Sequence, residues 1–205
     1  CGVFLGAGSQ AEYGRKEHPA SPHDPAFPEN GYGMAKLCAG QMTREVCRRN
    51  GVRHVWCRIF SVYGPIDGAH TMVMSGINKL LDGVRPAYTS GEQQWDYLYC
   101  GDAARAFLLA AEKGKDGSVY CVGSGKTRPL SEYILAIRDA ASPGADIGIG
   151  EIPYSEKQVM FLCADISSLT ADTGFLPQTS FEEGVRTTVE SIKTQRSAVS
   201  RPGVE

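Results

Sequence analysis

One helical segment between two short strand-like segments constrains the fold of this chain more than any other feature. Over residues 31–49 apolar side chains recur near helical spacing, and Asn50 and Gly51 then supply residues that tolerate the backbone of a helix end. Residues 2–5 and 52–60 have the apolar, β-branched and aromatic composition of strands. Strand, helix and strand in this order predict a parallel sheet, because parallel strands need a long crossover between them.

The rest of the chain continues this alternation. We expect helices near residues 71–82, 102–113 and 130–141 and strands near 94–100, 118–122, 147–152 and 158–163. Ser180 and Glu183 have the spacing of a capping box, which predicts a last helix to about residue 194 and then a frayed tail over 196–205. The fold class is therefore α/β.

Composition excludes several classes of function. The formal net charge is -2, and the Lys and Arg residues form no basic run, so we expect no nucleic-acid partner. No apolar stretch approaches the roughly 20 residues that cross a bilayer, which predicts a cytoplasmic protein without a membrane partner. The cysteines lack metal-ligand spacing, and free thiols with no metal site are expected. These cysteines are Cys1, Cys38, Cys47, Cys57, Cys100, Cys121 and Cys163.

A glycine-rich run near the start imitates a dinucleotide-binding loop. Gly6-Ala7-Gly8-Ser9-Gln10-Ala11 follows a predicted strand and matches G-x-G-x-x-A. That loop binds pyrophosphate only where a helix begins at the glycines, because the phosphates bind to the free N–H groups of the helix. Residues 7–30 are proline-rich and aperiodic, so we interpret them as a long loop that presents side chains to a cleft.

Three side chains form a candidate catalytic set. Tyr32 and Lys36 are four residues apart in the predicted helix and therefore project from one face. A phenol ordinarily ionises at a pH of about 10, and a nearby ammonium favours its ionised form, which can exchange a proton with a substrate oxygen. Ser9 ends the preceding strand, at the edge where parallel sheets bind ligands, and its hydroxyl can donate to the same oxygen. By itself Y-x-x-x-K is common, and the strand-end serine is what favours catalysis.

These segments resemble a known family. Phe4–Gly14 (FLGAGSQAEYG), Tyr32-Gly-Met-Ala-Lys36 and Arg58-Ile-Phe-Ser-Val-Tyr-Gly-Pro65 are similar to motifs of the NAD-dependent epimerase/dehydratase family, the extended short-chain dehydrogenases. Later landmarks follow in the same order, at residues 95–104, 119–125 and 171–177. The resemblance covers nearly the whole chain, from Val3 to about Lys193.

The resemblance implies a site and a domain plan. It implies Ser9 as the donor to a substrate oxygen, Tyr32 as the proton-transfer residue, and Lys36 as the residue that favours the tyrosinate and binds the nicotinamide ribose. The substrate side would comprise Ser9, Gln10, Ser61 and Trp95, and the cofactor side Tyr32, Lys36, Phe60 and Val62. Residues 1–65 would be the carboxyl-terminal half of a Rossmann-type NAD(P)-binding domain, and residues 66–205 a smaller α/β substrate-binding region partly interleaved with the sheet.

The departures from the family matter equally. Cys1 runs directly into a strand-like segment, and the family's first strand and glycine-rich turn are absent, so we expect a fragment that is inactive alone. Dehydratases of the family carry an Asp-Glu pair where this chain has Gln10 and Ala11, which disfavours dehydration. Trp95 stands where members of the family often have an arginine that binds the nucleotide phosphates. This chain therefore lacks the family's usual phosphate-binding side chain at that position.

The expected function is therefore an NAD- or NADP-dependent epimerase or ketoreductase acting on a small-molecule substrate, a nucleotide-linked sugar, with a homodimer plausible by analogy. The alternative is a non-catalytic sensor of the same fold that binds a dinucleotide.

Overall fold

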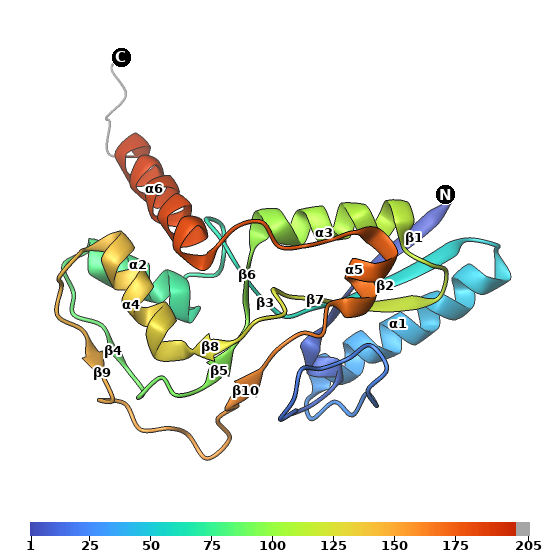
Figure 1. The fold of residues 1–205 in the computed structure, drawn as a ribbon, viewed down its shortest axis with the longest axis horizontal. Helices are drawn as coiled ribbons and strands as arrows, with labels where there is room; N and C mark the ends of the chain where they lie inside the picture. The colour runs from blue at the N-terminus through green and yellow to red at the C-terminus, as the bar shows by residue number, and fades with distance from the viewer. Residues whose placement is uncertain (200–205) are drawn as a thin grey trace. The chain divides into compact units, whose positions relative to one another are not determined.

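The computed structural model describes residues 1–199, and the chain forms two compact units (Figure 1). The first unit comprises residues 1–62, 93–128 and 159–178, and the second comprises residues 63–92 and 129–158 and the described residues from 179 onward. The sequence predicts one boundary at residue 65 with later interleaving. In the structure the chain returns to the first unit twice, because a central sheet gathers segments that are distant in the sequence.

A parallel sheet lies at the centre of the first unit. Its strands are β1 (Val3–Ser9), β2 (Arg53–Ile59) and β7 (Ser118–Val122), in the order β1-β2-β7. Gly6 pairs with Trp56, and Trp56 pairs in turn with Val119. The predicted α/β fold with parallel strands is therefore confirmed.

Helices cover both faces of this sheet. Helix α1 (Gly31–Arg49) packs on one face, where Gly40 lies against the indole of Trp56. Val55 and Cys57 point to the opposite face, because successive side chains of a strand alternate. There they form a buried cluster with Ala106 of α3 (Cys100–Lys113) and Leu169 of α5 (Ser167–Thr173). Figure 1 shows α1 and α3 on opposite sides of the three strands.

Short elements complete the first unit. The strand β1 leads into the 3-10 turn η1 (Gln10–Glu12), and β3 (Ser61–Tyr63) pairs with β6 (Tyr97–Tyr99). A small sheet has the order β10 (Phe161–Leu162), β5 (Gln94–Trp95) and β8 (Arg128–Pro129).

The second unit is mainly helical. Its helices are α2 (Met72–Leu81), α4 (Leu130–Ala141) and α6 (Phe181–Val199), and α4 contacts both of the others. Tyr133 meets Phe181 edge to face, with ring centroids 4.6 Å apart, and Ile134 and Ile137 are buried beside them. Two short parallel strands, β4 (Ala87–Tyr88) and β9 (Gly148–Ile149), complete it.

Several predicted boundaries agree with the structure. The helices over 31–49 and 130–141 and the strand over 118–122 have the predicted bounds.

Others were wrong. The first strand continues to Ser9 instead of ending at residue 5, because it pairs with β2 along its whole length. The strand expected over 94–100 is broken at Asp96, and α3 already begins at Cys100. Helix α6 runs through residues 196–199, which were expected in a tail, and the rest of that tail lies outside the described residues.

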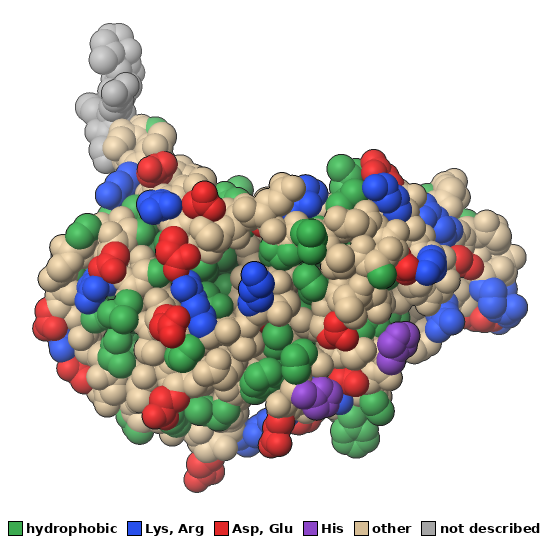
Figure 2. Space-filling view, viewed as in Figure 1, with side chains coloured by type: hydrophobic (Ala, Val, Ile, Leu, Met, Phe, Trp, Pro, Cys, Tyr) green, Lys and Arg blue, Asp and Glu red, His purple; other side chains and the backbone are tan. Residues whose placement is uncertain are grey.

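Charge is mixed on the face shown in Figure 2, where Lys and Arg side chains alternate with Asp and Glu. Within residues 1–199, no helix combines the length and apolar character that a bilayer span requires.

Candidate active site

Ser9 ends β1 and begins η1 as its N-cap. The side chain is buried, and its Oγ accepts a hydrogen bond of 3.2 Å from the backbone N–H of Ala11. The backbone N–H of Ser9 donates to Oε1 of Glu12 at 2.9 Å, which completes a capping box. No acceptor within residues 1–199 takes the hydroxyl hydrogen, so Ser9 can still donate to a substrate oxygen.

Tyr32 and Lys36 lie in the first two turns of α1. The helix begins after Asn30, whose Oδ1 accepts from the backbone N–H of Gly33 at 2.8 Å. Nζ of Lys36 donates to the carbonyl oxygen of Ala7 at 2.9 Å and lies 5.8 Å from the ring centroid of Tyr32. Tyr32 is 59% exposed as a residue, which leaves it accessible to a ligand. Lys36 thus ties the helix that carries the phenol to the strand that ends in Ser9.

A close backbone approach holds α1 against η1. A Cβ atom at Gly33 would lie 2.3 Å from the carbonyl oxygen of Ala11, so only glycine fits there. A Cβ atom at Gly31, two residues earlier, would meet nothing within 4 Å. The glycine at 33 therefore sets the distance between the start of α1 and the residues that follow Ser9.

The glycine-rich run at residues 6–8 serves packing. Gly6 and Gly8 lie inside β1, beyond the predicted end of the strand at residue 5. No α-helix begins at these glycines, in agreement with the rejection of a dinucleotide-binding loop. Cβ atoms at these positions would come within 2.2 Å and 2.3 Å of the Trp56 side chain. A Cβ at Gly40 would lie 2.8 Å from the same indole on its other side. The three glycines thus make room for Trp56 between strand and helix.

The remaining predicted residues lie near the carboxyl ends of the strands. Gln10 follows Ser9 and is half-buried on η1. Phe60 is buried in a cluster with Tyr13 and Cys121, and Val62 packs against the cluster on the α3 face. The indole N–H of Trp95 donates to Oγ of Ser61 at 2.8 Å, so the structure brings these two predicted substrate residues together.

Two buried acids escaped the sequence prediction. Glu12 is fully buried and accepts from Nε of Arg58 at 2.7 Å. Asp96 is also fully buried and accepts from the backbone N–H groups of Ser124, at 2.7 Å, and Ala164, at 3.0 Å. Burial raises the pKa of Asp96, and these hydrogen bonds oppose the rise.

A sequence signal for Glu12 existed. Ser9 and Glu12 have the same S-x-x-E spacing as Ser180 and Glu183, which predicts the start of the last helix. The position of Asp96 between two short strands has no such local signal, because its partners come from distant segments.

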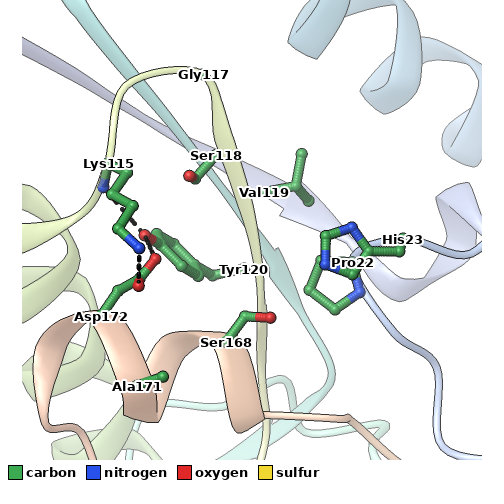
Figure 3. Close-up of a pocket in the computed structure, with 10 residues that line it drawn as sticks. All are labelled: Pro22, His23, Lys115, Gly117, Ser118, Val119, Tyr120, Ser168, Ala171 and Asp172. Atoms are coloured by element: carbon green, nitrogen blue, oxygen red, sulfur yellow. Dashed lines mark hydrogen bonds and ion pairs between the residues drawn. The ribbon is translucent and has the colours of Figure 1, made fainter.

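A cavity of about 500 Å³ lies elsewhere in the first unit, beside β7 and α5 (Figure 3). Its polar side chains bind each other: the Tyr120 hydroxyl donates to Asp172 at 2.8 Å, and Nζ of Lys115 lies 2.5 Å from the same carboxylate. None of the predicted catalytic residues lines it. Size alone therefore does not identify the reactive site.

Comparisons with known proteins identify the family of the chain. The model of the NAD dependent epimerase/dehydratase family matches residues 1–123. The chain is 26% identical over 196 residues to a dTDP-4-dehydro-6-deoxyglucose reductase of Escherichia coli, covering 93% of this chain and 61% of that protein. The chain thus spans about three fifths of the length of this relative.

Solved structures have the same fold. A UDP-N-acetylglucosamine 4-epimerase from Methanobrevibacter ruminantium, in complex with UDP-N-acetylmuramic acid, is 26% identical with a TM-score of 0.86, covering 95% of this chain and 64% of that one. RMD from Pseudomonas aeruginosa, complexed with NADPH, is 22% identical with a TM-score of 0.85, covering 94% and 67%.

Proposed function

Because the chain belongs to the NAD-dependent epimerase/dehydratase family, we propose that the protein containing it is an NAD(P)-dependent enzyme. It oxidises and re-reduces, or simply reduces, a carbon of a nucleotide-linked sugar. One observation carries the proposal: the Lys36 ammonium lies beside the Tyr32 ring and binds the strand that ends in Ser9. Relatives named for reductase and 4-epimerase activities on such sugars support it.

Each of the three side chains has a role in this reaction. Ser9 donates its hydroxyl hydrogen to the reacting sugar oxygen and orients it. Tyr32 takes the proton of the sugar hydroxyl during oxidation and returns a proton during reduction. The Lys36 ammonium lies beside the Tyr32 ring, and its remaining N–H donors are available to a ribose hydroxyl.

The residues present fit the nicotinamide end of the cofactor. Phe60 and Val62 are apolar residues that follow β2 on either side of the polar Ser61, and each packs against a different buried cluster. When bound, the nicotinamide supplies the hydride chemistry. The Trp56 side chain fills the space beside the glycines of β1. The pyrophosphate of the cofactor would therefore bind to other residues.

The side chains after Ser9 favour an epimerase or ketoreductase over a dehydratase. Removal of water needs an acid and a base at the sugar, whereas Gln10 and Ala11 carry no ionisable group.

We assign the reaction to the cytoplasm, as the sequence predicts.

We further propose that α1 pairs with a second copy of the protein. Met34, Cys38, Met42 and Val46 follow each other at intervals of four residues, and all four are exposed. A helix stripe of this kind is an apolar surface that a second helix can cover.

Two substitutions in the full-length protein test the enzymatic function. Tyr32→Phe should lower turnover of a nucleotide sugar by about 10²- to 10⁴-fold while cofactor binding is kept, because only the proton donor is lost. Ser9→Ala should also lower turnover, whereas the matched control Ser168→Ala, in the cavity beside β7, should not. Unchanged turnover in Tyr32→Phe would favour the non-catalytic sensor, and loss in the control alone would move the site to that cavity.

A further inference from the structure

A buried carboxylate lies directly behind the catalytic serine. Glu12 has no exposed surface, and its two oxygens accept four hydrogen bonds. The backbone N–H of Ser9 donates at 2.9 Å, Nε1 of Trp56 at 3.0 Å and 3.2 Å, and Nε of Arg58 at 2.7 Å. All of these donors belong to the first unit, on β1 and β2.

The charge of Glu12 is matched by one cation. Arg58 is itself buried, and its guanidinium lies 4.2 Å from the ring centroid of Tyr13, the residue after Glu12. The Tyr13 hydroxyl in turn lies 3.2 Å from Sγ of Cys121 on β7. Buried ion pairs seldom add much stability over apolar residues of the same size, so stability alone explains this arrangement poorly.

The arrangement does control the conformation of Ser9. The capping box fixes the backbone of Ser9 through its N–H and directs one lone pair of Oγ to the N–H of Ala11. With that lone pair occupied, the hydroxyl hydrogen points away from η1. A serine held in one rotamer loses little conformational freedom when it binds a substrate oxygen.

We propose that Glu12 is a positioning residue of the active site: held by Arg58 and Trp56, its carboxylate fixes Ser9 so that the hydroxyl is presented to the reacting sugar oxygen. This inference rests on the proposed function, because it assigns Ser9 to the reaction. It adds a residue that does not itself touch the substrate and acts only through Ser9.

The test is a double-mutant cycle on kcat in the full-length protein. Glu12→Gln keeps the shape but offers an amide N–H to the donors of Trp56 and Arg58, so it should lower kcat about 10- to 100-fold with KM nearly unchanged. In a Ser9→Ala background the same change should have an effect of less than about 3-fold, because the positioned hydroxyl is already gone. A merely structural role for Glu12 would lower kcat equally in both backgrounds, and that result would overturn the proposal.

A second variant covers the case in which Glu12→Gln does not fold, as judged by thermal unfolding and cofactor binding. Glu12→Gln combined with Arg58→Met removes the unpaired buried cation and should fold, with a similarly lowered kcat. Wild-type kcat in either folded variant would also overturn the proposal. If Ser9→Ala itself keeps full turnover, the proposed function fails instead, so the two failures are distinguishable.

Discussion

Replacing Gly33 by alanine should separate the start of α1 from the residues that follow Ser9. The new Cβ would lie 2.3 Å from the Ala11 carbonyl oxygen, whereas relaxed contacts need about 3.4 Å, so helix and turn must move apart by about 1 Å. The same shift would stretch the 2.9 Å bond between Lys36 and Ala7 beyond hydrogen-bonding distance. We expect a loss of about 1–3 kcal/mol in the free energy of unfolding, the usual result of overpacking.

The Gly33→Ala variant should also lose turnover, and this loss should exceed what its lowered stability alone would cause. A misplacement of about 1 Å between reacting groups can lower turnover about 10²-fold, and here it would affect Tyr32 relative to Ser9. Urea unfolding followed by tryptophan fluorescence measures the first effect, and the initial rate with NAD(P) and a nucleotide sugar measures the second.

Gly31→Ala is the matched control for this change. Its Cβ would meet nothing within 4 Å, and alanine favours a helix over glycine by up to about 1 kcal/mol, so the control should be neutral or stabilising. Equal stability and equal turnover of the two variants would refute the close approach at Gly33 as the feature that positions α1.

Two further predictions concern the thiols and the exposed stripe of α1. Burial raises the pKa of Cys57 and of Cys121 to about 12, so both thiols stay protonated up to pH 8 and should escape iodoacetamide until urea unfolds the chain. The exposed Cys1, which lies outside the stripe, should be alkylated at once. Mass spectrometry of peptides checks this, and labelling of Cys121 in the native protein would contradict its burial. Met42→Glu should convert the proposed dimer to a monomer in light scattering, while Gln41→Glu, which adds the same charge off the stripe, should not; a wild-type monomer would remove the basis for the pairing.

Features that depend on neighbours along the chain were predictable from the order of the residues. Helix α1 has its predicted bounds because Asn30 caps its start and Asn50 and Gly51 follow its end. The spacing of Tyr32 and Lys36 follows from the helix repeat, and the alternation of helices with apolar segments required a parallel sheet. The decoy at Gly6 was also recognisable, because no periodic helix follows it.

The contacts between distant segments became visible in the folded chain. The sequence could not show that Lys36 binds the carbonyl of Ala7, 29 residues earlier, or that Trp56 fills the space left by the glycines of β1. The break at Asp96 likewise arises from N–H groups as far away as Ala164. The physical reason is the same in each case: hydrogen bonds within a turn of helix are fixed by spacing along the chain, whereas contacts between segments depend on a packing that the whole sheet must first create.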